Sequence, residues 1–163
     1  MGGVTIFWMQ ILVSCVVLSL VATWYVWPSL NRIPRNTALI LLLFVHVPRY
    51  VGMTELVPGM IDPKLPYAFT SSAAYGDLLA AALALASIFA LRRNWRGAVA
   101  LVWVANSWGF LDLLNGVRDV LQLNLPSFNL DTLWYIYTFY APLVLISHLM
   151  IFWVLIKSNS WKK

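Results

Sequence analysis

The chain has 163 residues, of which 61 % are hydrophobic and only 10 % are charged, and its mean hydropathy is +0.78. Soluble domains are about 45–50 % apolar and about 25 % charged, so the composition excludes a soluble fold of this length. The single cysteine excludes an internal disulfide and a thiolate metal cluster, and the net charge of +5 is scattered between apolar blocks rather than gathered into a nucleic-acid-binding stripe. We therefore predict an integral membrane protein that binds no nucleic acid.

Five apolar blocks are long enough to cross a bilayer, for which a helix needs about 20 residues. The blocks show no alternation of apolar and polar residues, so strands of a barrel are not expected. The first block has no basic residue ahead of it and is too long for a signal peptide, which favours a retained helix. We predict one all-α domain over residues 1–163, a helical bundle with transmembrane helices at residues 4–27, 36–54, 73–91, 97–117 and 133–156.

The basic residues predict how this bundle is oriented. With five spans, eight of them fall on one side: Arg32, Arg35, Arg92, Arg93, Arg96, Lys157, Lys162 and Lys163. The opposite side receives only Lys64 and Arg118, with Arg49 near it. By the positive-inside rule, we expect an inner (plasma) membrane protein with the N-terminus outside and the C-terminus in the cytoplasm.

Three charges are forced into the membrane by the lengths of the blocks. Thirteen residues separate Arg35 from Arg49, which is about 20 Å of helix and too short to cross a core of about 30 Å. Either the second block does not cross, or Arg49 lies in the outer third of the membrane. Similar counts place Asp77 and Asp112 inside the third and fourth spans. Buried charges persist where they pair or reach water, so we expect Arg49 to pair with one of these acids, leaving the other to find a hydrogen bond, a proton or a ligand.

Helical spacing predicts which side chains accompany Arg49. His46, Arg49 and Tyr50 are three and four residues apart, so they share one face of an α-helix. Pro48 lies among them and lacks a backbone N–H, which should leave the carbonyl of Phe44 free to accept from water or a ligand.

On the fourth span, polar residues form a stripe at helical spacing that consists of Trp108, Asp112, Asn115 and Asp119. Asn106 lies on another face and is expected to bond a neighbouring helix. On the third span, small side chains on the face of Asp77 should let helices approach closely: Ala80, Ala81 and Ala84.

On the fifth span, Tyr137 and His148 share a face, and Pro142 predicts a kink. The aromatic residues at 134–137 also fit an interfacial belt, whereas Tyr140 lies deeper than a belt requires.

Among the outer connections, residues 55–72 are rich in proline and apolar residues, which suggests a lid over the outer mouth of the bundle. Residues 119–130 are interpreted as an interfacial segment.

The leading functional hypothesis is a pocket that binds a small lipophilic or amphipathic molecule, with the option of chemistry on that molecule. Its catalytic candidates are His46, Asp77 and Asp112, with His46 and one acid as an acid/base pair. Its binding candidates are Arg49, Tyr50, Trp108, Asn115, Tyr137, Tyr140 and His148. No set of metal ligands is expected, no cofactor is indicated, and the expected partners are the lipid bilayer, the small molecule and either a second copy or a membrane-complex subunit.

Three alternatives remain open at this stage. In a proton- or ion-coupled transporter, Asp77 and Asp112 would carry the coupling. In a haem protein, His46 and His148 would be the axial ligands, since they lie on different spans. In a non-catalytic subunit or assembly factor of a membrane complex, the charged cluster would be only a structural lock.

Overall fold

The computed structural model describes residues 2–157, and throughout this range the ordered elements are helices, with no strand. Five helical rods are long and apolar enough to cross a membrane, namely Gly3–Leu30, Arg35–Leu56, Tyr67–Arg92, Ala98–Gln122 and Leu133–Ile156. The prediction of an all-helical bundle with five membrane-length helices is confirmed. The third helix begins six residues earlier than expected, and the fourth ends five residues later. Lys162 and Lys163 lie outside the described residues.

Several rods are divided into segments of different helix type. The first consists of α1 (Gly3–Val21), the π-helical η1 (Ala22–Val26) and α2 (Trp27–Leu30). The second consists of α3 (Arg35–Leu43) and the 3-10 helix η2 (Val47–Leu56), and the third is α4 (Tyr67–Arg92). The fourth is α5 (Ala98–Gln122), followed by the short 3-10 turn η3 (Leu125–Ser127). The fifth consists of α6 (Leu133–Tyr135), the π-helical η4 (Ile136–Tyr140) and α7 (Ala141–Ile156).

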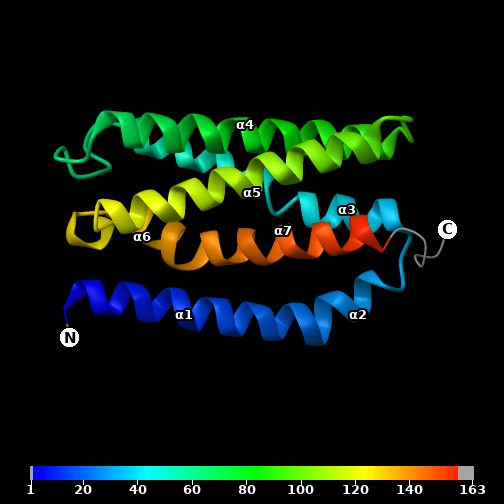
Figure 1. Ribbon diagram of the computed structural model, residues 1–163, viewed down its shortest axis with the longest axis horizontal. Coiled ribbons are helices and arrows are strands. Elements are labelled where there is room, and N and C mark those ends of the chain that lie inside the picture. The colour runs from blue at the N-terminus through cyan, green and yellow to red at the C-terminus, as the bar shows by residue number, and fades with distance from the viewer. Residues whose placement is uncertain (1, 158–163) are drawn as a thin grey trace.

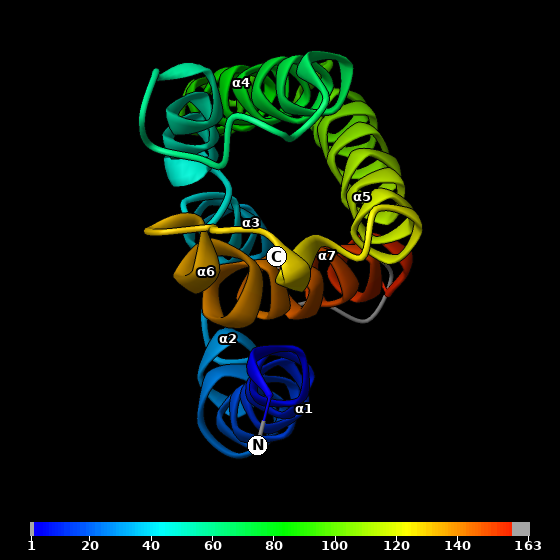
Figure 2. The same ribbon diagram turned by 90° about the vertical axis from the view of Figure 1, so that its left-hand side faces the viewer.

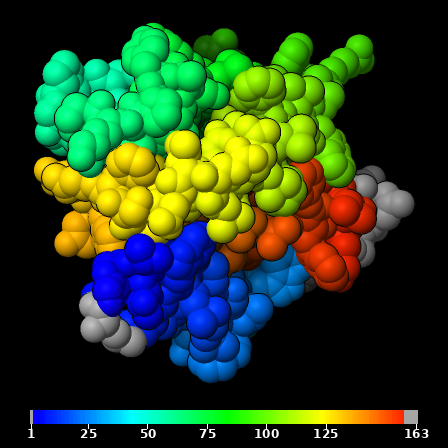
Figure 3. Space-filling view, turned by 60° about the vertical axis from the view of Figure 1, so that its left-hand side comes forward, coloured from blue at the N-terminus to red at the C-terminus, as the bar shows by residue number. Residues whose placement is uncertain are grey.

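Four rods close a ring, and the N-terminal rod lies outside it (Figures 1 and 2). Around the ring, α4 packs on η2 and α5, and α7 packs on α5 and α3. Helix α1 packs mainly on the outside of α7, η4 and η3. In α1 only Phe7 is buried. The face of α1 that points away from the bundle is covered by no described part of the chain. In Figure 3 this helix, in blue, projects from the lower side of the bundle, below the yellow and orange segments.

Both π-helical segments come just before a proline. Pro28 and Pro142 each lack a backbone N–H, and their rings crowd the carbonyl four residues earlier, at Trp24 and Thr138. These carbonyls lie within η1 and η4, where the wider helix moves them away from the ring. The distortion expected at Pro142 is therefore a π-helical turn on its N-terminal side.

The second rod changes from α-helix to 3-10 helix near Pro48. Helix α3 ends at Leu43, and after a turn the chain forms ten residues of 3-10 helix, much longer than the usual three or four. Because a 3-10 helix has three residues per turn, its aligned face contains Arg49, Gly52 and Glu55, all buried. The prediction that Tyr50 shares this face is wrong: its side chain is 55 % exposed, because α-helical spacing does not apply here.

The interior has two apolar cores with a polar layer between them. One core lies toward the C-terminal end of the bundle and includes Leu39, Leu43 and Ile151. The other lies toward the opposite end and includes Phe7, Phe69 and Leu125. Buried charged and polar side chains gather in the layer between: His46, Arg49, Asn106, Ser147 and His148.

The two long connections at the N-terminal end of the bundle are joined to each other. The Asp62 amide donates to the carbonyl of Asn129, and the Asn129 amide donates back to the Asp62 carboxylate. Bonds from the Lys64 and Asn129 amides lower the pKa of Asp62. Leu65 and Leu130 belong to these connections and are buried in the apolar core at this end of the bundle. Residues 119–122 belong to α5, which continues to Gln122, and Leu125 and Leu130 are buried in the core. The interfacial position expected of residues 119–130 stays a prediction.

Candidate functional site

Arg49 lies at the centre of the polar layer and holds two acids from two other rods. Its Nε and Nη2 both lie 2.7 Å from Asp77 Oδ1, and Nη2 also lies 2.5 Å from Asp112 Oδ2. Its Nη1 donates to the carbonyl of Gly109 at 3.0 Å. The structure thus brings together the three charges that the block lengths predict to lie within a membrane, and Arg49 bonds both acids instead of the expected one. The guanidinium is fully engaged, with side-chain exposure of 4 %.

Three glycines make room for this ion triad of Arg49, Asp77 and Asp112. A β-carbon on Gly52 would collide with the carboxylate of Asp77, and one on Gly76 would collide with that of Asp112. A β-carbon on Gly109 would lie 3.0 Å from Arg49 Nη1 and 2.9 Å from the ring of His148. Each glycine therefore permits a backbone to approach a buried charge closely.

The two histidines lie behind the triad, in bonds that define their tautomers. The Ser147 hydroxyl donates to the carbonyl of Leu42, so it accepts at 3.1 Å from Nε2–H of His46. The Asn106 amide donates to the carbonyl of His148, so its oxygen accepts at 2.8 Å from His148 Nδ1–H. The interhelical bond expected of Asn106 is therefore present. His46 Nδ1 and His148 Nε2 have no partner among the described residues.

This histidine pair has no room for a haem. The ring centroids of His46 and His148 are 4.2 Å apart, whereas axial imidazoles lie on opposite sides of a porphyrin plane. The rings border a cavity of about 10 Å³, which is the space of one water molecule. Within residues 2–157, no group of three or more metal-ligating side chains is arranged around a common centre.

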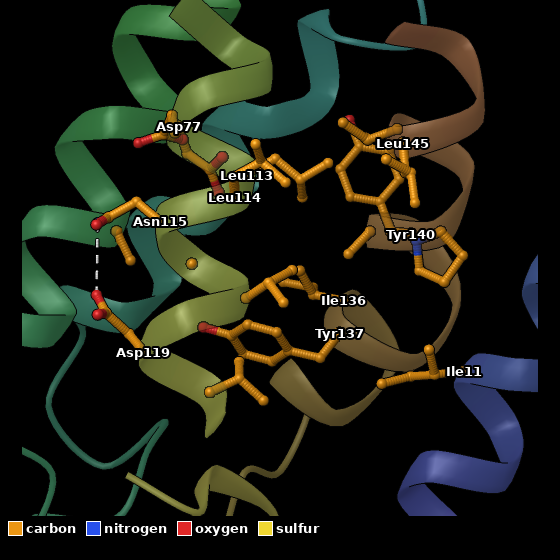
Figure 4. Close-up of a pocket in the computed structure, with 18 of the residues that line it drawn as sticks. Ile11, Asp77, Leu113, Leu114, Asn115, Asp119, Ile136, Tyr137, Tyr140 and Leu145 are labelled. Atoms are coloured by element: carbon orange, nitrogen blue, oxygen red, sulfur yellow. Dashed lines mark hydrogen bonds between the residues drawn. The ribbon is translucent and has the colours of Figure 1, made fainter. Parts of the chain in front are cut away.

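A cavity of about 210 Å³ lies on the other side of the triad (Figure 4). It is called the main cavity because Arg49, Asp77 and Asp112 all line it. Its walls are largely apolar and come from α1, α5, η4 and α7, including Ile11, Leu113, Ile136 and Leu145. Its polar groups include Arg49, Glu55, Ser72, Asp77, Asp112, Asn115, Asp119, Tyr137 and Tyr140. In Figure 4 the two tyrosines extend from the fifth rod toward α5, and Asn115 bonds Asp119 at 3.5 Å.

The two tyrosines connect the cavity wall to the second rod. The Tyr140 hydroxyl donates at 2.7 Å to the carbonyl of Val45, which is three residues before Pro48. In a 3-10 helix that carbonyl would accept from the missing N–H of Pro48, so tyrosine replaces it. The sequence prediction named the carbonyl of Phe44 instead, because it assumed α-helical spacing. The Tyr137 hydroxyl donates at 2.9 Å to Oε1 of Glu55.

Several sequence-predicted residues lie elsewhere. His46 and His148 do not line the main cavity, because the triad lies between them and it. Trp108 is 44 % exposed and does not line the main cavity. It lines a shallow groove on the outer face of α4 and α5, together with Asp112 and Asn115 of the same predicted stripe. Tyr50 lines none of the described cavities. Arg49, Asn115, Tyr137 and Tyr140 do line the main cavity, as do Asp77 and Asp112.

Sequence reasoning missed Glu55, which it assigned to a loop. Glu55 is 5 % exposed, and its Oε2 has no hydrogen-bond partner among residues 2–157. The sequence does contain a signal for Glu55, because it lies three residues after Gly52, which in turn follows Arg49 and His46 at the same spacing. Such spacing puts residues on one face only in a 3-10 helix, so using the signal required predicting that helix type.

A family model described as Domain of unknown function (DUF8737) matches residues 6–156. The chain belongs to this family. The match extends from the first rod to the end of α7 and includes every residue of the ion triad and of the main cavity. No curated protein and no solved structure matches the chain.

The glycines around the triad generate a prediction about stability. Gly109→Ala places a methyl group against Arg49 and His148, so it should destabilise the protein by roughly 1–3 kcal/mol through overpacking. Gly76→Ala should do the same against Asp112. Gly116→Ala, also in α5, meets nothing within 4 Å and is the matched control. Thermal unfolding in detergent should show midpoints lowered for the first two variants only. Equal midpoints for Gly109→Ala and Gly116→Ala would contradict the close approach.

Proposed function

We propose that this protein resides in a membrane and binds a small lipophilic or amphipathic molecule in its main cavity. The observation that carries the proposal is an apolar cavity of about 210 Å³ with the ion triad and Tyr140 at one end. Ligand sites in helical bundles combine apolar walls with a few convergent polar groups in this way. The polar end would orient the ligand, and the walls would contribute most of the affinity.

The position of the cavity supports entry from the lipid. Trp8 of α1 and Leu114 and Val117 of α5 line the cavity and are also 38 %, 46 % and 48 % exposed. Such residues mark a mouth between α1 and α5, on the face that lipid chains would cover. The volume is below the roughly 300–1,000 Å³ of sites for drug-sized ligands. A small head group would therefore fill the cavity while an apolar tail extends into the mouth.

The arrangement favours binding over the catalytic and coupling roles considered for the same residues. His46 donates to Ser147 and is separated from the main cavity by the triad, so it is not placed to exchange protons with a ligand there. Proton coupling by Asp77 and Asp112 would require each to leave Arg49 during a cycle. Binding requires neither movement.

The first test uses a substitution in the cavity wall that places a larger side chain in the cavity. A β-carbon on Gly116, which lines the cavity, meets nothing within 4 Å, so Gly116→Leu should fold normally and occupy the space of the ligand. Wild-type protein in nanodiscs should be stabilised against heat by at least one member of a panel of quinones, sterols, fatty alcohols and fatty amines. Gly116→Leu should lose that stabilisation, whereas Gly116→Ala should keep most of it. A panel without any effect on the wild type, or an effect that survives Gly116→Leu, would contradict the proposal.

We also propose that the basic end of the bundle faces the cytoplasm of an inner membrane. Arg32 follows the end of α2, Arg92 is the last residue of α4, and Lys157 follows the end of α7. These helix ends lie together at one end of the bundle, and the connection from η2 to α4, which contains Lys64, lies at the opposite end (Figure 1). The excess of cations at the first end supports this orientation through the positive-inside rule.

Labelling of single cysteines tests the orientation. In a Cys15→Ser background, Lys64→Cys and Arg93→Cys each put a thiol at an exposed site, and the two sites lie at opposite ends of the bundle. An impermeant maleimide applied to intact bacterial cells should label the first variant and leave the second unlabelled until the membrane is opened. Labelling of Arg93→Cys in intact cells would show that the bundle has the opposite orientation.

A further inference from the structure

Glu55 differs from the other acids at the main cavity because no cation holds it. Asp77 and Asp112 bond to Arg49, and Asp119 bonds to Arg118 at 2.8 Å. Glu55 accepts only from the hydroxyl of Tyr137, and its Oε2 has no partner among the described residues, although the residue is 95 % buried. Burying a carboxylate without full compensation is costly, so Glu55 in its ionised form requires a further donor.

The charge around the cavity favours a cation as that donor. Four carboxylates line the cavity, those of Glu55, Asp77, Asp112 and Asp119, and the only cation among the lining residues of the described chain is Arg49. Even when Arg118, which bonds Asp119 from outside the cavity lining, is counted, four carboxylates face only two cations. An anionic ligand would be repelled, and a neutral alcohol would supply a hydrogen bond without balancing the charge. A protonated amine supplies both.

We propose that the ligand is a lipophilic amine whose protonated nitrogen binds Glu55. This inference rests on the proposed function and names the class of molecule that the cavity takes. Tyr137 holds one carboxylate oxygen of Glu55 and leaves the other for the ammonium group. The apolar walls from α1, α5 and the fifth rod enclose the part of the ligand next to the nitrogen, and its hydrocarbon tail leaves through the mouth at Trp8 and Leu114.

The decisive experiment compares three probes that share one chain and differ in charge: octylamine, octanol and octanoate. Wild-type protein in nanodiscs at neutral pH should be stabilised against heat in a saturable manner by the amine. The alcohol should bind about tenfold more weakly, and the carboxylate should have no effect. This order of affinities tests the inference on the wild type alone, without relying on the folding of any variant. Equal binding of the amine and the alcohol would overturn it.

Two isosteric variants locate the nitrogen. Glu55→Gln removes the unpaired charge, so its affinity for octylamine should fall about tenfold or more while its affinity for octanol changes little. Asp119→Asn is the matched control at an acid that Arg118 already holds, and its affinity for octylamine should change less than threefold. If Glu55→Gln binds octylamine as tightly as the wild type does, the inference is wrong.

Failure of the inference can be told apart from failure of the proposed function. Gly116→Leu should abolish the response to both octylamine and octanol if the cavity is the site. If the cavity binds octanol as well as octylamine and Gly116→Leu abolishes both, lipophile binding stands and the amine inference fails. If the responses survive Gly116→Leu, binding takes place elsewhere and both proposals fail.

Discussion

The bond network of Arg49 is the constraint on which the rest of the structure depends. One guanidinium from η2 bonds Asp77 on α4, Asp112 on α5 and the backbone of α5 at Gly109. Removing one partner of a buried ion pair costs roughly 3–5 kcal/mol, because the remaining charge is left without compensation. Arginine suits this position because its planar fork presents donors in several fixed directions at once. The triad therefore sets how three neighbouring rods pack against each other.

The 3-10 helix η2 connects this constraint to the cavity. With three residues per turn it presents Arg49, Gly52 and Glu55 on one face, so that one short segment supplies the cation, the space for Asp77 and the unpaired acid. Pro48 leaves a carbonyl without a backbone donor in this geometry, and Tyr140 bonds to it from the fifth rod. The same features that distort the second rod therefore hold the cavity wall in place.

Much of the architecture could be predicted from the sequence, because the lengths of apolar blocks and the cost of buried charge are strong constraints. They indicated five rods and placed Arg49, Asp77 and Asp112 at a common depth. The clearest error concerns Tyr50, which α-helical spacing placed on the face of Arg49 and which is exposed. Trp108 lies beside Asp112 and Asn115 as its spacing predicts, but in the outer groove of α4 and α5 and not in the main cavity. The spacing of residues that share a face depends on the helix type, which changes near Pro48. Spacing also does not determine which neighbouring helix a given face contacts. Predicting the role of the glycines around the triad would have required knowledge of tertiary contacts, which no local sequence pattern contains. Glu55 was missed because the sequence analysis assigned it to a loop.

The energetic coupling within the triad can be measured most directly by removing its charges singly and together. Arg49→Met alone should lower the free energy of unfolding in detergent by roughly 3–5 kcal/mol, because Asp77 and Asp112 are left buried without their cation. Arg49→Met combined with Asp77→Asn and Asp112→Asn leaves no uncompensated charge and should regain more than half of that loss. If the losses in free energy of unfolding from the three substitutions simply add, the account is contradicted. Additive losses are expected of side chains that act independently, and not of a coupled buried triad.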